Sequence, residues 1–328
     1  PYPVGWPTME ERHDHHRCPA RALAATALAA LLGTAACGDP APAASAAGRQ
    51  SAPSPSASAP QKSAPQKSTP QESTPQAGET LPAPDQKIPG DPARLAAALK
   101  GTSAALDAAI DAWPKTGKPP RDVELLALHQ QRVYRYTARH PEVAARAFAR
   151  LPSGLAAEAK DNTAAIRELL SLAHPIKPSA TFKVQPAPPA AELLGHFKKA
   201  ERRFGVEWEV LAAVMFAETK FGRVKSDSHV GAQGPMQFMP GTWKAYGMGG
   251  DVQDPRDAVM GAANYLRASG APRDYRRALY AYNHSRAYVN AILLHARQMK
   301  RDPRNYYAYY NWQVFVITTA GERRLTGP

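Results

Sequence analysis

The chain has 328 residues, of which 44% are hydrophobic and 21% are charged, and its formal net charge is +13 at pH 7. This apolar content is sufficient for one or two packed domains and excludes a chain that is disordered throughout. The two cysteines, at positions 18 and 37, exclude a scaffold that depends on several disulfides.

The N-terminus has the pattern of an export signal. After a basic stretch, apolar and small residues run from Ala22 to Ala36, which is too short a run to span a membrane as a permanent helix. We expect residues 1–36 to be removed, either by ordinary signal cleavage or by lipoprotein processing that acylates Cys37. The protein would then be extracellular or in the cell envelope, and attached to a membrane only through a lipid anchor at Cys37.

Removal of this leader would also remove two groups of chemical interest. Cys18 lies before either cut, so the mature chain would hold no internal disulfide. The His-Asp-His-His cluster at residues 13–16 lies in the leader as well, and we therefore predict no metal site from it.

Residues 37–90 have the composition of a disordered tether. Between Gly38 and Gly90 the large apolar residues are Leu81 and Ile88, and a five-residue unit repeats as SAPQK, STPQE and STPQA. Such a segment cannot bury enough apolar surface to offset its conformational entropy. Because proline-rich chain stays extended, at roughly 3 Å per residue, this tether would hold a folded part well clear of a membrane.

The excess of positive charge belongs to the folded part. Residues 1–90 carry seven Lys and Arg and seven Asp and Glu, so the net +13 falls on residues 91–328. For an exported cation the expected partners are anionic cell-wall polymers and lipid head groups, and nucleic acid is not expected in this compartment. The alternative is that the charge serves only solubility.

Residues 91–175 are predicted to form a helical region. Good helix formers occupy 93–113, 123–140 and 154–174, and prolines separate these runs. The histidines in this region are scattered, and we predict that each is a surface or capping residue rather than a ligand; they are His129, His140 and His174. The proline-rich segment 176–190 is predicted to be a linker to the next domain.

Two helices are predicted between residues 191 and 221, with a break at Gly205. In the second helix Leu211, Val214 and Met215 form an apolar side, and Glu218 follows them on that same side. Burial disfavours a carboxylate and raises its pKa, as a general acid near neutral pH requires. The alternative is a structural Glu paired with a cation such as Lys220 or Arg223.

Three sequence motifs favour a catalytic role for Glu218. They are A-E-T-K-F-G-R at 217–223, S-x-x-G-A-x-G-x-M-Q-F-M-P-x-T-W at 228–243, and A-Y-N at 281–283. In order and spacing they resemble the lytic murein transglycosylases with a goose-type-lysozyme-like catalytic domain, of the exported actinobacterial type. The resemblance covers residues 190–300. It implies a mostly α, lysozyme-like domain over 191–328 that cleaves the glycan strands of peptidoglycan.

The resemblance also implies roles for individual residues of the substrate groove. Ser228 would lie near the muramoyl substituents, Gln237 would hydrogen-bond to the sugar, and Met239 would form part of the groove wall. Tyr282 would lie beside the catalytic acid, where its hydroxyl can orient the carboxyl group or the scissile region, and Asn283 would fix the adjoining helix junction. Met236 and Phe238, between these groove residues, are predicted to face the core.

Glu218 is the single strong candidate for acid–base chemistry, whereas ordinary glycosidases use two carboxylates. The resemblance implies that this acid protonates the glycosidic oxygen and then, as a base, deprotonates the C6 hydroxyl, which leaves a 1,6-anhydromuramoyl end. The muramic acetamide would stabilise the oxocarbenium ion between these steps. Neither a metal nor an organic cofactor is expected.

A second acidic cluster, Asp251, Asp254 and Asp257, suggests a calcium loop or a further catalytic carboxylate. Asp254 is followed by proline, by apolar residues at helical spacing and by a glycine at 270, which is typical of an N-cap, a proline at the first helical position and a glycine stop. We therefore predict a capping role for this cluster.

The sequence thus predicts a lytic transglycosylase that cleaves the MurNAc-GlcNAc β-1,4 bond of peptidoglycan in cell-wall remodelling. One alternative is a lysozyme-type hydrolase on the same fold, which would leave a reducing end. A second alternative is a wall-binding protein without turnover, against which a buried acid argues.

Overall fold

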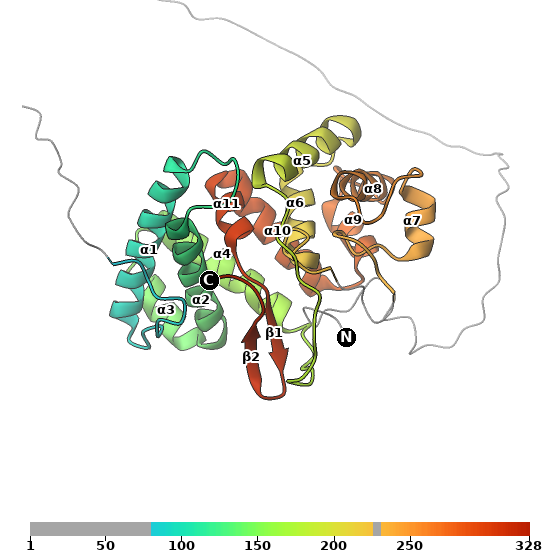
Figure 1. Cartoon of the computed structure of the whole chain (residues 1–328). Coiled ribbons are helices and arrows are strands. Elements are labelled where there is room, and N and C mark those ends of the chain that lie inside the picture. Colours follow the sequence, from blue (N-terminus) through green and yellow to red (C-terminus); the bar gives the residue numbers. More distant parts are fainter. Residues whose placement is uncertain (1–79, 226–230) are drawn as a thin grey trace, which may run out of the picture. The chain divides into compact units, whose positions relative to one another are not determined.

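The computed structural model describes residues 80–225 and 231–328. In these ranges it contains eleven α-helices and one two-stranded sheet, so the predicted mostly α fold is confirmed (Figure 1). Within the same ranges, none of the helices combines the length and the apolar character needed to cross a lipid bilayer. The predicted export signal, Cys37, most of the tether and Ser228 lie outside the described residues.

The first four helices contain the three helical runs predicted between 91 and 175, together with one short helix that was not predicted. Their bounds are α1 Pro92–Ala112, α2 Arg121–Arg139, α3 Pro141–Phe148 and α4 Ser153–Leu170. Asp91 caps α1 by accepting a hydrogen bond from the backbone N–H of Arg94 at 2.9 Å. Prolines at or next to the first helical position begin the other three, because proline lacks the N–H that this position leaves unpaired.

The prediction for one histidine of this region is wrong. His129 is buried in α2, and its Nδ1 shares a hydrogen bond of 2.9 Å with the Thr102 hydroxyl of α1. Burial, with a smaller contribution from Arg132, lowers the pKa of His129, which favours a neutral imidazole between the two helices. His140 lies at the junction of α2 and α3, and His174 is exposed, as predicted.

The remaining helices carry the sequence motifs. Their bounds are α5 Ala190–Phe204, α6 Trp208–Thr219, α7 Pro240–Tyr246, α8 Pro255–Ala268, α9 Tyr275–Tyr282, α10 Arg286–Arg301 and α11 Arg304–Asn311. The break at Gly205 is confirmed, since this glycine has φ 68° and ends α5 in the left-handed conformation. The capping role of Asp254 is also confirmed: its Oδ1 accepts from the N–H of Asp257 at 3.0 Å, with Pro255 at the first helical position.

One continuous hydrophobic core joins the early and the late helices. It includes Leu99 of α1, Tyr134 of α2, Met215 of α6 and Tyr309 of α11. Helix α10 packs against α4 and also against α6, so that it connects a helix of the 91–175 region with the helix that carries Glu218 (Figure 1). The position of α6 therefore depends on both halves of the described chain.

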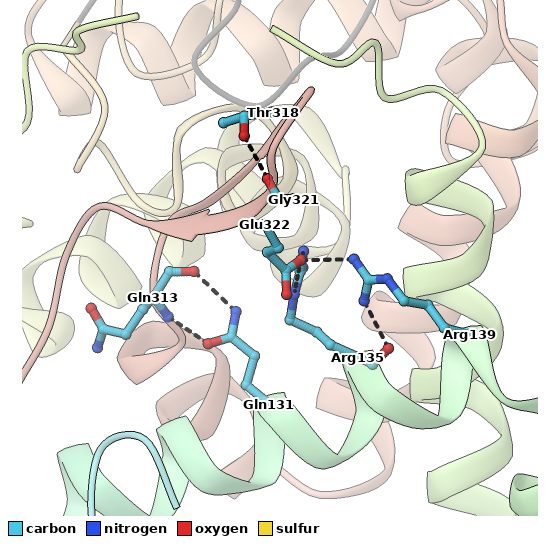
Figure 2. Close-up of polar contacts among 7 residues, drawn as sticks. All are labelled: Gln131, Arg135, Arg139, Gln313, Thr318, Gly321 and Glu322. Atoms are coloured by element: carbon cyan, nitrogen blue, oxygen red, sulfur yellow. Dashed lines mark hydrogen bonds and ion pairs between the residues drawn. The ribbon is translucent and has the colours of Figure 1, made fainter. Parts of the chain in front are cut away.

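After α11 the chain forms a β-hairpin that was not predicted. Strand β1, Phe315–Thr318, pairs antiparallel with β2, Gly321–Arg324. Figure 2 shows how α2 holds it: the Gln131 side chain donates to the Gln313 carbonyl at 2.9 Å and accepts from its N–H at 2.8 Å. Glu322 of β2 accepts hydrogen bonds from Arg135 and Arg139 of the same helix.

The segment predicted as a linker is bound along its length. The N–H of Ile176 donates to the Ile317 carbonyl of the hairpin at 3.0 Å, and the N–H of Gln185 donates to the Arg223 carbonyl just after α6 at 2.9 Å. These backbone contacts connect the hairpin with the end of the helix that carries Glu218.

Candidate active site

Helix α6 presents Glu218 from a buried support. Every residue of this helix from Glu209 to Ala217 is buried, and Glu218 follows as a partly exposed residue at its end. Lys220 and Phe221 then have φ values of 52° and 60°, so the chain reverses immediately after the helix. Because buried neighbours fix the helix and a tight reversal fixes its end, the carboxyl group of Glu218 has a defined position.

Thr219 ties this helix end to the segment that carries the second motif. Its hydroxyl donates to the Pro235 carbonyl at 2.7 Å and accepts from the Gly222 N–H at 2.9 Å. Both partners are backbone groups, so these two hydrogen bonds fix the backbone of the two segments relative to each other. The first and second sequence motifs thus form one structural unit.

The surroundings of Glu218 favour its protonated form. Protein atoms surround the carboxyl group densely, and this burial raises the pKa of Glu218 to about 7; a hydrogen bond from Tyr288 and the charge of Lys220 limit the rise. Among the described residues, Glu218 takes part in no ion pair with Lys220 or Arg223. A carboxyl group that titrates near neutral pH can give up and recover a proton under physiological conditions.

Tyr288 is the direct partner of the acid, and it was not predicted. Its hydroxyl donates to Glu218 Oε1 at 2.7 Å, and its side chain is buried near the start of α10. Ser285, two residues beyond the A-Y-N motif, caps this helix by accepting from the Tyr288 N–H at 3.3 Å. The signal in the sequence was the N-cap serine, which places a tyrosine in the first turn of α10.

Tyr282, which was expected to lie beside the acid and to orient the carboxyl group or the scissile region, makes its hydrogen bond to the backbone of the second motif. Its buried hydroxyl donates to the Met236 carbonyl at 2.6 Å, so it holds the backbone of the second motif. It remains close enough for the charge of Glu218 to raise the pKa of Tyr282, although burial is the larger cause. Asn283 is buried and lies between α9 and α10, at the junction that was predicted for it.

The second motif forms a tight turn around a glycine. A Cβ atom at Gly234 would lie 1.9 Å from the Val252 carbonyl oxygen, and φ there is 71°, so the position requires glycine. Gln237 has φ 51°, and its side-chain amide donates to the Gly234 carbonyl at 3.0 Å. Gly234 and Gln237 both line a cavity of about 70 Å³.

The turn of the second motif buries the two residues that were predicted to face the core. Met236 and Phe238 are fully buried, which confirms their assignment to the core. Met239, at 8% exposure, lies at the N-cap of α7. The contacts of Gln237 and Met239 with a sugar remain predictions. In the structure the Gln237 side-chain amide donates its hydrogen bond within its own turn, to the Gly234 carbonyl.

Within residues 80–225 and 231–328, the acidic, histidine and cysteine side chains form no cluster of three that would hold a metal ion. This finding includes the Asp251, Asp254 and Asp257 segment, in which Asp254 serves as the N-cap of α8.

The described site combines a mostly helical support with one carboxyl group, that of Glu218, which titrates near neutrality. Residues 195–304 match the family model described as the transglycosylase SLT domain. This stretch includes Glu218, Gln237, Tyr282 and Tyr288, and it is similar to transglycosylase SLT domains, a lysozyme-like family that acts on peptidoglycan. No solved structure was found to match the chain.

Proposed function

We propose that the protein is an exported lytic transglycosylase that cleaves the MurNAc-GlcNAc β-1,4 bond and leaves a 1,6-anhydromuramoyl end. The observation that carries this proposal is the Glu218–Tyr288 pair, in which a densely surrounded carboxyl group with a pKa of about 7 lies 2.7 Å from a buried hydroxyl. The described neighbours that shift this pKa are a tyrosine and a lysine, not a second carboxylate.

The reaction needs one residue in two successive roles. Protonated Glu218 gives its proton to the glycosidic oxygen as the C1–O4 bond breaks, and the muramic acetamide stabilises the positive charge at C1. The resulting carboxylate then takes the proton of the C6 hydroxyl, whose oxygen forms the new bond to C1. Glu218 ends protonated, so the cycle closes without water. Tyr288 donates its hydrogen bond to the carboxylate in the middle of this cycle, which is when a charge must be stabilised.

A lysozyme-type hydrolase is the alternative, because the same acid can begin hydrolysis if water reaches C1. The two reactions differ in their products, since an anhydromuramoyl end is one water lighter than a reducing end. Mass spectrometry of the muropeptides released from peptidoglycan by the purified protein distinguishes them. We expect anhydro ends, and reducing ends alone would establish the hydrolase.

The cellular setting is part of the same proposal. The apolar run before Cys37 supports export, and Cys37 would carry a lipid anchor if it becomes the mature N-terminus. The proline-rich tether would then give the enzyme reach from the membrane into the wall. The net positive charge of residues 91–328 supports attraction to anionic wall polymers, which would assist capture of the substrate rather than its cleavage.

A further inference from the structure

A second cavity lies behind the catalytic helix, under the C-terminal hairpin. It measures about 40 Å³ and is bordered by α2, α4, α6, α10 and the segment from Trp312 to Ile317. One part of its lining is buried and consists of Phe216, Lys220, His295 and Trp312. Another part is half-exposed and consists of Leu170, Ala173, Phe315 and Ile317. Glu218 and Tyr288 do not line it. The cavity is thus distinct from the active site and has its opening beside the hairpin.

His295 brings unsatisfied polar atoms to this cavity. It is fully buried, and neither of its ring nitrogens has a hydrogen-bond partner among the described residues. The rings of Phe216 and Tyr309 pack edge-on against it, with centroids 4.9 Å away in each case. A buried N–H without a partner is unfavourable, so an acceptor inside the cavity would be stabilised there. Burial lowers the pKa of His295 to about 3, and the ring is therefore neutral with one N–H to donate.

Lys220 brings a cation to the same cavity. Its side chain is buried, and its Nζ donates to the Phe216 carbonyl at 2.9 Å and lies 4.1 Å from the centre of the Phe216 ring. An ammonium group has three donors, and this contact uses one of them. Burial, with a smaller contribution from Arg135, lowers the pKa of Lys220 to about 7. An anion in the cavity would hold Lys220 in its charged form.

The charges around the cavity are unbalanced in favour of an anion. Arg135 also lines it, and both Arg135 and Arg139 donate to the single carboxylate of Glu322 (Figure 2). One carboxylate thus faces two guanidinium groups, and Lys220 and Arg223 add further cations against the single carboxyl group of Glu218. Most of the remaining lining is aliphatic or aromatic, which favours an anion with a short apolar part over a hydrated inorganic ion.

We propose that this cavity is a binding site for a small carboxylate of about the size of acetate. The carboxylate oxygens accept hydrogen bonds from Lys220 and His295, and the methyl group contacts the apolar lining. A cavity of about 40 Å³ has room for roughly three water molecules, which is close to the four heavy atoms of acetate. The inference stands independently of the function proposed above, because neither Glu218 nor the substrate groove supplies a group that lines this cavity.

The direct test is titration of the purified protein with isotope-labelled acetate, followed by NMR line broadening at constant ionic strength in a buffer without carboxylates. We expect saturable binding of acetate and none of acetamide, its neutral analogue. Lys220→Met and His295→Phe should each weaken binding by at least about tenfold, since each removes a donor to a charged acceptor. The control is Lys160→Met, which neutralises an exposed lysine of α4 and should leave binding unchanged.

The pH dependence gives a second readout. Acetate binding should weaken as the pH rises above about 7, because Lys220 loses its proton. The ionisation of nearby Glu218 acts in the same direction, while Arg135, Arg223 and Glu322 keep their charges and His295 stays neutral.

Three outcomes would overturn the proposal. They are absence of saturable acetate binding to the wild-type protein, equal binding of acetamide, and unchanged acetate binding by both folded variants. His295→Phe retains an aromatic ring among its neighbours, so it keeps the test decisive if Lys220→Met fails to fold.

Discussion

The hydroxyl of Tyr288 lies 2.7 Å from Glu218 Oε1, across 70 residues of sequence, and donates the hydrogen bond that holds this carboxyl group. Burial raises the pKa of this carboxyl to about 7, and the Tyr288 hydrogen bond opposes that rise. The pair therefore sets both the position of the acid and the pH at which it releases its proton.

Tyr288→Phe removes this hydrogen bond and leaves the ring in place. The carboxylate loses a stabilising donor, so the pKa of Glu218 should rise further, by about 1 unit for a charged hydrogen bond of about 1.5 kcal/mol. In the wild type, activity should fall as the pH rises through about 7, because Glu218 loses its proton. In the Tyr288→Phe variant, this fall should occur at a higher pH. A pH profile of kcat/KM measures this shift. Tyr280→Phe, at an exposed tyrosine of α9, is the matched control, and an equal shift in that variant would contradict the assignment.

The same raised pKa predicts how stability changes with pH. Because the folded pKa of Glu218 is about 7 and its ordinary value is 4.5, the neutral carboxyl stabilises the fold below pH 4.5, and this contribution is lost as the pH rises through 7. Glu218→Gln cannot ionise. It should therefore be more stable than the wild type at pH 8, by up to about 3 kcal/mol, and close to it at pH 4. Urea unfolding at both pH values provides the measurement, and equal differences at the two values would show that the carboxyl is not buried as described.

The turn of the second motif requires glycine at position 234 for two reasons, a φ of 71° and the Val252 carbonyl 1.9 Å from a Cβ atom. Gly234→Ala should destabilise the fold by more than about 2 kcal/mol, because strain and overlap add. Gly231→Ala has a similar φ, 88°, but nothing within 4 Å of the new methyl group, and should cost only about 1 kcal/mol. Thermal unfolding of both variants compares the two effects. Similar losses would mean that backbone strain alone accounts for the glycine.

Features that depend on local chemistry were predictable from the sequence. The break at Gly205 and the cap at Asp254 follow from residue types that suit left-handed backbone and helix N-termini, and the structure contains both. The apolar side of α6 placed Glu218 among buried residues, which was sufficient to predict the direction of its pKa shift. These conclusions required no knowledge of which distant segments meet.

Features that depend on distant contacts were not predictable in the same way. Tyr288 and Tyr282 both follow Glu218 by more than sixty residues, and only the packing of α10 on α6 determines which hydroxyl reaches the carboxyl. The burial of His129 likewise depends on Thr102 from another helix. The hairpin had a local signal, the β-branched run before Gly321, but its position follows from the bonds of Glu322 to α2.

The most direct test of the central claim is the turnover of Glu218→Gln on purified peptidoglycan. The amide keeps the size of the side chain but can neither donate the proton to the glycosidic oxygen nor take one back from the C6 hydroxyl. The variant should bind sedimented peptidoglycan as the wild type does and release soluble fragments at least about a hundredfold more slowly. Glu209→Gln, at another buried carboxyl of α6, should keep wild-type turnover. Release by Glu218→Gln within tenfold of the wild type would contradict the account.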